Sequence, residues 1–352
     1  MLIANKIPNR TVDCDGKEYQ FFSGTSYLGM NSCPEFLDHL VEGMKSYGTN
    51  YSSSRNSNFR LKVYEEAEQH IAAYTGAGAT LTVSSGYMAG QLTVRALEGK
   101  GEFIFAPNTH PALWTKPTDF FYADFEEWTI TLPDKIKEST SKELFIITNS
   151  LDPLLAKQYN FDWIASLPRE RKITILIDDS HGFGITGHDG SGIYSQVKKS
   201  ENITLIVVSS FGKAMGIPGG IILSDEKTID LLKKSPYFNT SSPVAPAYLF
   251  AYLKSGKLYQ QKRKLLSDNI DHFLSLIAHT GLFQYFKNYP VFYTSQNKLY
   301  PFLMDKKILI SSFAYPLPND DLITRIIINS NHQLEDINFL ANCVIEYKNQ
   351  CQ

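Results

Sequence analysis

Short runs of apolar and β-branched residues alternate with stretches of helical periodicity between residues 79 and 224. Most of these runs are continuous rather than alternating, which is typical of strands buried on both faces of a mostly parallel sheet. Helices and strands that alternate along a chain form layered α/β domains. The pattern therefore predicts an α/β domain with strands at residues 80–83, 103–105, 144–148, 173–177, 203–208 and 220–223, and with helices at residues 87–97, 124–132 and 161–167.

The pattern differs on either side of this region. The first 45 residues contain one predicted helix, at residues 34–45, and form an N-terminal arm. After Pro243 we expect one or two long helices over residues 245–279, then strands at 309–311 and 325–328, and a terminal helix at 333–347. We therefore divide the chain into an arm (residues 1–45), a large domain (46–239) and a smaller C-terminal α+β domain (240–352).

Composition excludes several classes of protein. The chain has 352 residues, with 34 basic and 36 acidic side chains and a net charge of −2, so it has no basic excess to hold a nucleic acid. Its four cysteines lie far apart, and the histidines show no metal-ligand spacing, so neither a disulfide framework nor a metal site is expected. No apolar run approaches the length of a membrane span, and the first residues do not form a secretory signal. We expect a cytoplasmic protein that binds neither nucleic acid nor membrane.

One short pattern suggests a dinucleotide site. Gly182, Gly184 and Gly187 match G-x-G-x-x-G and follow the predicted strand at 173–177. Four polar residues, 178–181, nevertheless separate that strand from the first glycine, and the residues after the pattern form turns instead of a helix that could hold a pyrophosphate. A nicotinamide cofactor is therefore not expected.

Polar residues stand where the predicted strands end. In open α/β sheets, ligands bind beyond the carboxyl ends of the strands. In chain order, the residues at these positions are Ser85, Gly86, Tyr87, His110, Ser150, Asp178, His181, Ser210 and Lys213.

Together these residues suit one ligand, pyridoxal 5′-phosphate (PLP). The aldehyde of PLP needs a lysine to bond to, and Lys213 lies in a Gly/Ser-rich turn. The ring nitrogen needs a carboxylate to stay protonated, which Asp178 can supply. The phosphate needs backbone N–H groups at a helix N-terminus, which residues 85–87 can supply. His110 could stack on the ring, and His181 could reach its hydroxyl.

Each of these residues also has an ordinary structural explanation. Asp178 could form a turn with a side-chain hydrogen bond, and Lys213 could be a solvated surface lysine. His110 precedes a proline and could cap a helix. Only the combination of these residues, and no single one of them, points to PLP.

The sequence resembles the α-oxoamine synthases, which are fold-type I PLP-dependent enzymes that include 8-amino-7-oxononanoate synthase and 2-amino-3-ketobutyrate CoA ligase. The matching segments follow the order of that family over nearly the whole chain. They are Tyr27-Leu28-Gly29, SSGYMAGQ (84–91), THPAL (109–113), IDDSHGFGITGHDGSG (177–192), SSFGKAMGIPGG (209–220), NTSSP (239–243) and RIIINSNH (325–332).

The resemblance implies a fold of the aspartate aminotransferase type, with a seven-stranded, mostly parallel sheet and a smaller C-terminal domain. It also implies a role for each matching residue. Lys213 would bond to the cofactor and move the proton, Asp178 would pair with the ring nitrogen, His181 and Ser150 would lie near the phenolic oxygen, and His110 would stack on the ring. Ser210 stands where the family usually has threonine, Thr240 would reach the phosphate of the neighbouring subunit, and Arg325 would bind the substrate carboxylate.

By this resemblance the protein is expected to be a homodimeric C-acyltransferase, with its active site at the subunit interface, that condenses an amino acid with an acyl-CoA. The sequence departs from the family at Thr25-Ser26, where an asparagine is usual, and in residues 51–60, where glycines and a histidine are missing. Because these segments would bind the substrates, an aminotransferase or lyase remains the alternative, and a non-catalytic PLP-fold protein is a further one.

Overall fold

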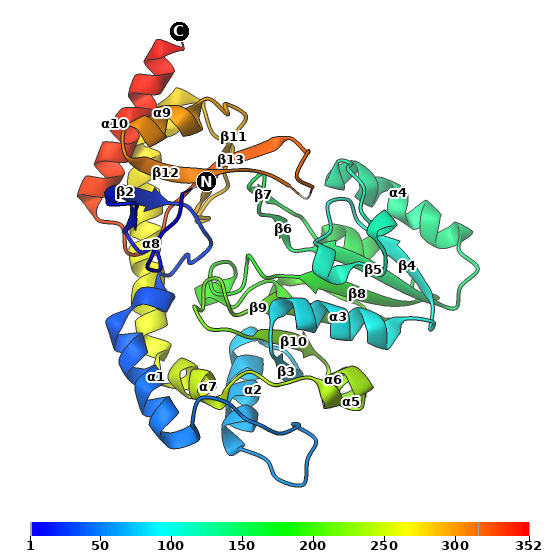
Figure 1. Ribbon diagram of the computed structural model, residues 1–352. Coiled ribbons are helices and arrows are strands. Elements are labelled where there is room, and N and C mark those ends of the chain that lie inside the picture. The colour runs from blue at the N-terminus through cyan, green and yellow to red at the C-terminus, as the bar shows by residue number, and fades with distance from the viewer. Residues whose placement is uncertain (1, 316, 352) are drawn as a thin grey trace.

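A computed structural model describes residues 2–315 and 317–351 of the chain, and a six-stranded sheet forms its centre (Figure 1). The strand order is β3-β10-β9-β8-β5-β4. Strands β4, β5, β8 and β9 run parallel, whereas β10 is antiparallel to both of its neighbours. The strands are β3 (Ala79–Val83), β4 (Glu102–Phe105), β5 (Glu143–Asn149), β8 (Lys172–Asp178), β9 (Ile203–Ser210) and β10 (Gly220–Ser224).

The α/β architecture agrees with the prediction from the sequence, but the implied count of seven strands is wrong for the described residues. Strand β4 lies at one edge of the sheet, with β5 as its one neighbour. The chain after β4 contains Pro107, Pro111 and Pro117 and forms two 3₁₀ turns, Pro111–Leu113 and Pro117–Asp119. Proline has no N–H to donate to a ladder, which disfavours a strand here, and among the described residues no strand pairs with the outer edge of β4.

Helices cover both faces of the sheet, which explains the continuous apolar runs. Along β5, Phe145 and Ile147 belong to the hydrophobic cluster on one face, whereas Leu144 and Ile146 belong to the cluster on the other. All four side chains are buried. On the first face lie α3 (Gly86–Leu97), α5 (Glu226–Lys233) and α6 (Pro236–Thr240), and the cluster on the second face includes residues of α2 (Lys62–Thr75), α4 (Phe125–Glu138) and α7 (Pro246–Lys254).

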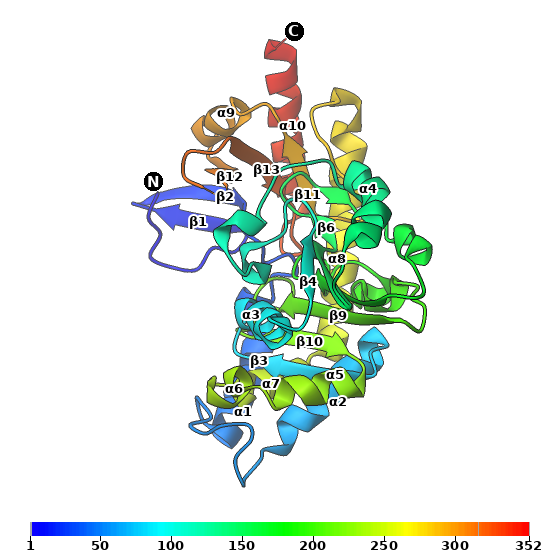
Figure 2. The same cartoon turned by 90° about the vertical axis from the view of Figure 1, so that its right-hand side faces the viewer.

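A second sheet combines the two ends of the chain. Its order is β1-β2-β12-β13-β11, and β2 pairs in parallel with β12. Figure 2 shows these strands in the upper part of the molecule, away from β3 and β10. The strands are β1 (Thr11–Cys14), β2 (Lys17–Phe22), β11 (Val291–Thr294), β12 (Ile308–Ala314) and β13 (Leu322–Ile327). The predicted arm therefore contributes two strands to the sheet of the C-terminal segment, and the domain limits at 45 and 239 stay a prediction.

The remaining helices complete the second layer. Helix α1 (Pro34–Tyr47) packs against α7. The other helices are α8 (Gly256–Ile277), α9 (Leu299–Asp305) and α10 (Leu334–Gln350), and α10 packs against α8. No helix in the described part of the chain is both long and apolar enough to cross a membrane.

Two predicted helices differ in detail. Residues 245–279 form the two helices α7 and α8, with Ser255 between them. Residues 161–167 form only a short 3₁₀ helix, Asp162–Ser166, instead of an α-helix. Pro168 follows directly and disfavours a helical conformation at the residue before it, so the helix cannot extend. A short antiparallel hairpin follows β5, and its two strands, β6 (Leu151–Asp152) and β7 (Lys157–Gln158), have two residues each.

Because β2 pairs with β12, a buried side chain of β2 should contribute to the stability of the whole fold. Phe22 in β2 is 0% exposed, and its ring centroid lies 4.1 Å from that of His332. We expect Phe22→Ala to lower the free energy of unfolding by about 3–5 kcal/mol, because the substitution leaves a cavity in the core beside the second sheet. Urea denaturation would measure this loss.

Phe339→Ala is the matched control, because Phe339 on α10 is 43% exposed. This variant should lose less than about 1 kcal/mol. Equal losses in the two variants would show that the arm is not part of the core.

Candidate active site

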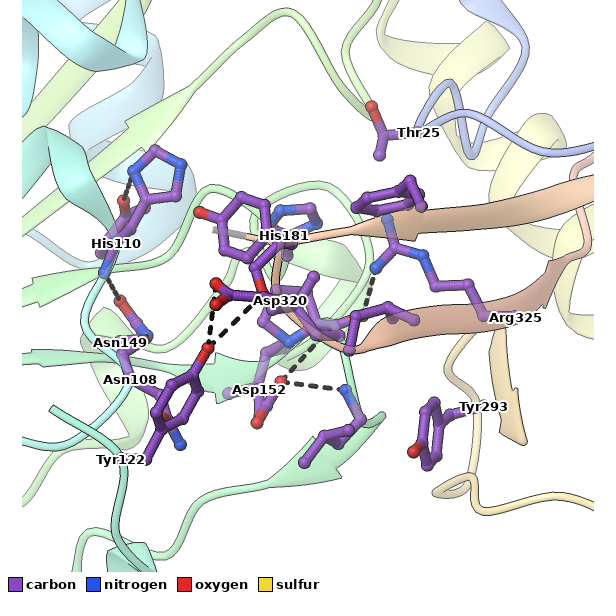
Figure 3. A pocket seen from close by; sticks show the side chains of 18 of the residues that line it. Thr25, Asn108, His110, Tyr122, Asn149, Asp152, His181, Tyr293, Asp320 and Arg325 are labelled. Atoms are coloured by element: carbon purple, nitrogen blue, oxygen red, sulfur yellow. Dashed lines mark hydrogen bonds and ion pairs between the residues drawn. The ribbon is translucent and has the colours of Figure 1, made fainter. Parts of the chain in front are cut away.

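A cavity of about 580 Å³ lies where the two sheets meet. One side is formed by the carboxyl ends of β5 and β8 and by the turn after β9, and the other by β12 and β13 of the second sheet. Figure 3 shows side chains from both sides around this space, with His110 and Asn149 opposite Arg325. The cavity brings together six of the residues predicted from the sequence, namely His110, Ser150, Asp178, His181, Lys213 and Arg325.

Strand register explains why these residues meet. In the parallel ladder, Asn149 at the end of β5 pairs with Asp178 at the end of β8, and Asp178 pairs with Val208 near the end of β9. The three strands therefore end at the same edge of the sheet. The residues that follow them, among them Ser150 and Lys213, are delivered to one place.

Lys213 carries a strongly perturbed amine. Burial lowers the pKa of Lys213 to about 8, and the carboxylates of Asp178 and Asp179 oppose this effect without cancelling it. At pH 7 roughly a tenth of such an amine is neutral, compared with roughly 0.04% at the ordinary lysine pKa of about 10.4. Lys213 is therefore suited to nucleophilic attack and to proton transfer near neutral pH.

Asp178 and His110 lie side by side without a direct hydrogen bond. Asp178 is 8% exposed, and its Oδ1 accepts the N–H of Ser180 at 2.8 Å. Its Oδ2 is 3.8 Å from Nδ1 of His110. That nitrogen instead accepts the N–H of Ala112 at 3.1 Å and caps the 3₁₀ turn that follows. His110 therefore both caps a helix and lines the cavity, and burial lowers its pKa, which favours the neutral ring.

Arg325 presents unused donors to the cavity. The side chain is 5% exposed and its guanidinium lies 5.3 Å from the centre of the Phe313 ring. Nη1 donates to the carbonyl of Pro153 at 2.6 Å, but Nε has no hydrogen-bond partner among the described residues. Leaving such a buried group unsatisfied costs about 1–3 kcal/mol or more, which a bound anion would recover. A carboxylate fits this planar group best.

Ser150 also presents a polar group to the cavity. Its side chain is 6% exposed, and within residues 2–315 and 317–351 its hydroxyl has no hydrogen-bond partner. The hydroxyl belongs to the residue directly after β5 and lines the same cavity. It is thus free to bind a polar atom of a ligand.

Four further predicted residues do not line this cavity. They lie where the N-terminus of α3 meets the end of β9, a place called the cradle below, and they are Ser85, Gly86, Tyr87 and Ser210. Ser85 caps α3 by accepting the N–H of Met88 at 3.0 Å. A Cβ at Gly86 would stand only 2.6 Å from the Cβ of Ser210, so the helix N-terminus packs directly on the turn that leads to Lys213. The side chain of Tyr87 is 61% exposed, so only its backbone can take part in this cradle.

Thr240 is the predicted site residue that the single chain does not bring near the others. It lies at the end of α6, is exposed, and its hydroxyl donates to the carbonyl of Pro236 at 2.8 Å. It does not line the cavity.

The altered segment at residues 51–60 also lies outside the cavity. Arg55 in this segment is buried against Glu68, with a 2.9 Å ion pair, and donates to Oγ1 of Thr82 at 3.1 Å. Its guanidinium lies 4.1 Å from the ring centre of Tyr64. Arg55 therefore holds the segment against α2 and β3.

Several cavity residues had no role predicted from the sequence, among them Asn149, which also stands at a predicted strand end. Oδ1 of Asn149 accepts the N–H of His110 at 3.1 Å, and Nδ2 donates to the carbonyl of Asn108 at 2.7 Å, so Asn149 fixes the loop that carries His110. Its place directly after a predicted strand was a usable signal. The aromatic wall had no such signal, because its residues come from segments far apart in the sequence, two of them in strands β11 and β12 of the second sheet. It includes Tyr122, Tyr293, Phe313 and Tyr315.

The lowered pKa of Lys213 predicts its chemical reactivity. An amine reacts with acetic anhydride only when it is neutral, so modification of Lys213 in the protein without added ligand should be half-maximal near pH 8 and reach a plateau above it. Mass spectrometry of the peptide that contains Lys213 would follow the reaction. Lys213→Arg should abolish modification at this position, and a midpoint above pH 10 would contradict the prediction.

Comparisons with known proteins identify the family of this chain. A family model described as aminotransferase class I and II matches residues 26–317. The 8-amino-7-oxononanoate synthase of Nitrosomonas eutropha is 26% identical over 71% of this chain, which spans about two thirds (66%) of that protein. The enzyme of the same name from Ectopseudomonas mendocina is 25% identical over 97% of this chain and 91% of its own length.

Solved structures share the fold. Serine palmitoyltransferase from Sphingomonas wittichii has a TM-score of 0.81 at 14% identity and covers 99% of this chain and 92% of its own. The 8-amino-7-oxononanoate synthase from Francisella tularensis has a TM-score of 0.73 at 21% identity, over 95% of this chain and 99% of its own. The predicted fold class and the resemblance to α-oxoamine synthases are confirmed. The chain belongs to the aminotransferase class I and II family.

Proposed function

We propose that this protein is a PLP-dependent C-acyltransferase of the α-oxoamine synthase type, which joins an amino acid to the acyl group of an acyl-CoA. The observation that carries the proposal is the buried amine of Lys213 in one cavity with Asp178, His181 and Arg325. Relatives named 8-amino-7-oxononanoate synthase and a structure of SPT with PLP support the reaction class and the cofactor.

The residues of the cavity fit PLP. Lys213 is the one lysine at the cavity wall within the described residues, and Asp178 supplies a carboxylate for the ring nitrogen. The unpartnered hydroxyl of Ser150 and the ring of His181 are available to the phenolic oxygen. When bound, PLP withdraws electrons from the α-carbon of an attached amino acid and makes its proton acidic.

The phosphate of PLP fits the cradle at the start of α3. The first N–H groups of a helix have no intrahelical acceptor, and the helix dipole favours an anion there. Gly86 lets this N-terminus pack closely against Ser210, three residues before Lys213. Ser210 adds a hydroxyl at the same place, where it already accepts the N–H of Gly212 at 3.1 Å.

The chain's own groups then divide the work. Arg325 binds the substrate carboxylate through its free N–H groups, and His110 stacks on the cofactor ring. Lys213, of which a substantial fraction is neutral near pH 7 to 8, takes the α-proton. The α-carbon bonds to the acyl carbon of the thioester, and the thiol of CoA leaves. The apolar wall, which includes Leu154, Leu155 and Phe313, receives the acyl chain.

The enzyme acts in the cytoplasm as a homodimer with its active site at the subunit interface. Tyr87, Leu231 and Tyr237 are 61%, 46% and 48% exposed in the single chain and lie on α3, α5 and α6, and α6 also carries Thr240. Such exposed apolar side chains are suited to burial against a second copy. In that dimer, Thr240 reaches the phosphate of the partner subunit.

Incubation with amino acids tests the reaction. PLP-loaded protein is given glycine, alanine or serine, with and without an acyl-CoA, and free CoA thiol is measured. Thiol release that needs both substrates supports the proposal. Formation of pyridoxamine 5′-phosphate without thiol release would instead show an aminotransferase, and an unchanged cofactor spectrum with every amino acid would show a non-catalytic protein.

The role of Arg325 predicts a specific kinetic change. Arg325→Lys keeps the charge but loses the planar pair of donors, so we expect the KM for the amino acid to rise about 10- to 100-fold, with a smaller effect on kcat. Steady-state kinetics would measure both constants.

Arg95→Lys is the matched control, because Arg95 pairs with Glu98 on α3, away from the cavity. It should leave both constants within about twofold. An unchanged KM in Arg325→Lys would remove Arg325 from the substrate site.

A further inference from the structure

The segment Tyr27-Leu28-Gly29 is held firmly against a turn of the second sheet. The carbonyl of Tyr27 accepts the N–H of Ser330 at 3.1 Å, and the hydroxyl of Ser330 donates to the carbonyl of Leu28 at 2.8 Å. Gly29 has a φ of 59°, in the left-handed region, and the side chain of Asn331 occupies the place where a Cβ would stand. The two sequence segments 27–29 and 329–332 therefore fix the backbone of Tyr27.

The side chain of Tyr27 reaches from this anchored segment to His181. Tyr27 is 0% exposed, and its hydroxyl lies 2.8 Å from Nδ1 of His181. His181 is one of the side chains around the cavity in Figure 3. The Tyr27 side chain therefore connects the segment beside the second sheet to His181, a cavity histidine that the proposed function uses.

The direction of this hydrogen bond follows from the surroundings. Burial raises the pKa of Tyr27, so its hydroxyl keeps its hydrogen, and burial lowers the pKa of His181 well below its usual value, so the imidazole is neutral. Nδ1 of His181 lies 2.8 Å from the Tyr27 hydroxyl. A neutral imidazole has one N–H donor and one nitrogen acceptor, so Nδ1 can accept the hydroxyl hydrogen of Tyr27 while the ring proton stays on Nε2.

We propose that Tyr27 is a positioning residue that donates its hydroxyl hydrogen to Nδ1 of His181 and so holds the imidazole in the tautomer with the proton on Nε2. Within residues 2–315 and 317–351, the side-chain hydrogen bond of His181 is made by Nδ1, and Nε2 makes none. Because His181 lines the cavity, Nε2–H is a donor available to a ligand.

The consequence for catalysis rests on the proposed function. A donor at Nε2 complements the phenolic oxygen of PLP, which is an acceptor when deprotonated. The opposite tautomer would place a lone pair against that oxygen and repel it. Tyr27 therefore acts through His181 and touches neither cofactor nor substrate.

The tautomer can be measured without cofactor. In the PLP-free protein labelled with ¹⁵N-histidine, two-bond ¹H–¹⁵N correlation spectra at pH 7.5 distinguish the protonated from the unprotonated ring nitrogen, and His181→Gln identifies the signals of His181. We expect the proton on Nε2 in the native protein. A proton on Nδ1 in the native protein would overturn the proposal, whatever the protein catalyses.

Two phenylalanine variants complete the test. Tyr27→Phe should move His181 to the Nδ1–H tautomer or to a mixture. Tyr289→Phe is the matched control, because the ring of Tyr289 is also 0% exposed and lies 6.2 Å from that of Tyr27, but its hydroxyl makes no hydrogen bond to His181 among the described residues. It should leave the tautomer unchanged. An unchanged tautomer in Tyr27→Phe would also overturn the proposal.

The holoenzyme gives a second measurement. In Tyr27→Phe we expect kcat for exchange of the substrate α-proton to fall about tenfold, with the amino-acid KM within twofold and with PLP still bound. Tyr289→Phe should keep the native kcat. If the native protein binds no PLP, the proposed function fails, while the tautomer spectra still decide the role of Tyr27.

Discussion

The opposition of one buried amine and one buried carboxylate organises the cavity of this protein. Lys213 and Asp178 belong to different strand ends, and the parallel register of β8 and β9 alone puts them together. Burial lowers the pKa of Lys213, and the neighbouring carboxylates keep that shift moderate. The result is an amine that exchanges a proton near neutral pH, which is the property that a lysine needs to serve as nucleophile and base.

The second sheet completes the cavity that the first sheet begins. Strand β13 carries Arg325, and the segment after β2 carries Tyr27, which lies behind His181. Some groups at this junction stay unsatisfied, among them Nε of Arg325 and the hydroxyl of Ser150. Each such group lowers stability by about 1–3 kcal/mol, and native proteins tolerate this cost mainly where a ligand supplies the missing partner. The junction is therefore built for binding at the expense of stability.

Sequence reasoning succeeded where residues close along the chain determine the outcome. Continuous apolar runs predicted the strands of the central sheet, because both faces of each strand are covered by helices. It failed where a local pattern has two outcomes. The run at residues 161–167 has helical periodicity but is too short and is followed by Pro168, so it forms a 3₁₀ turn. The family resemblance implied a seventh strand, but the chain after β4 forms 3₁₀ turns and the described sheet has six strands.

By itself, the sequence determined the chemistry at the strand ends: Lys213, Asp178 and His181 follow strands whose carboxyl ends share one edge in any parallel sheet. Only the tertiary structure decided which distant segments close the cavity. The pairing of β2 with β12 links residues nearly 290 positions apart, and neither strand's own pattern names its partner. The same holds for Tyr27 and His181, because a hydrogen bond between side chains 154 positions apart depends on the packing of both sheets. Local periodicity determines an element, whereas the contact between elements depends on the shape of the whole core.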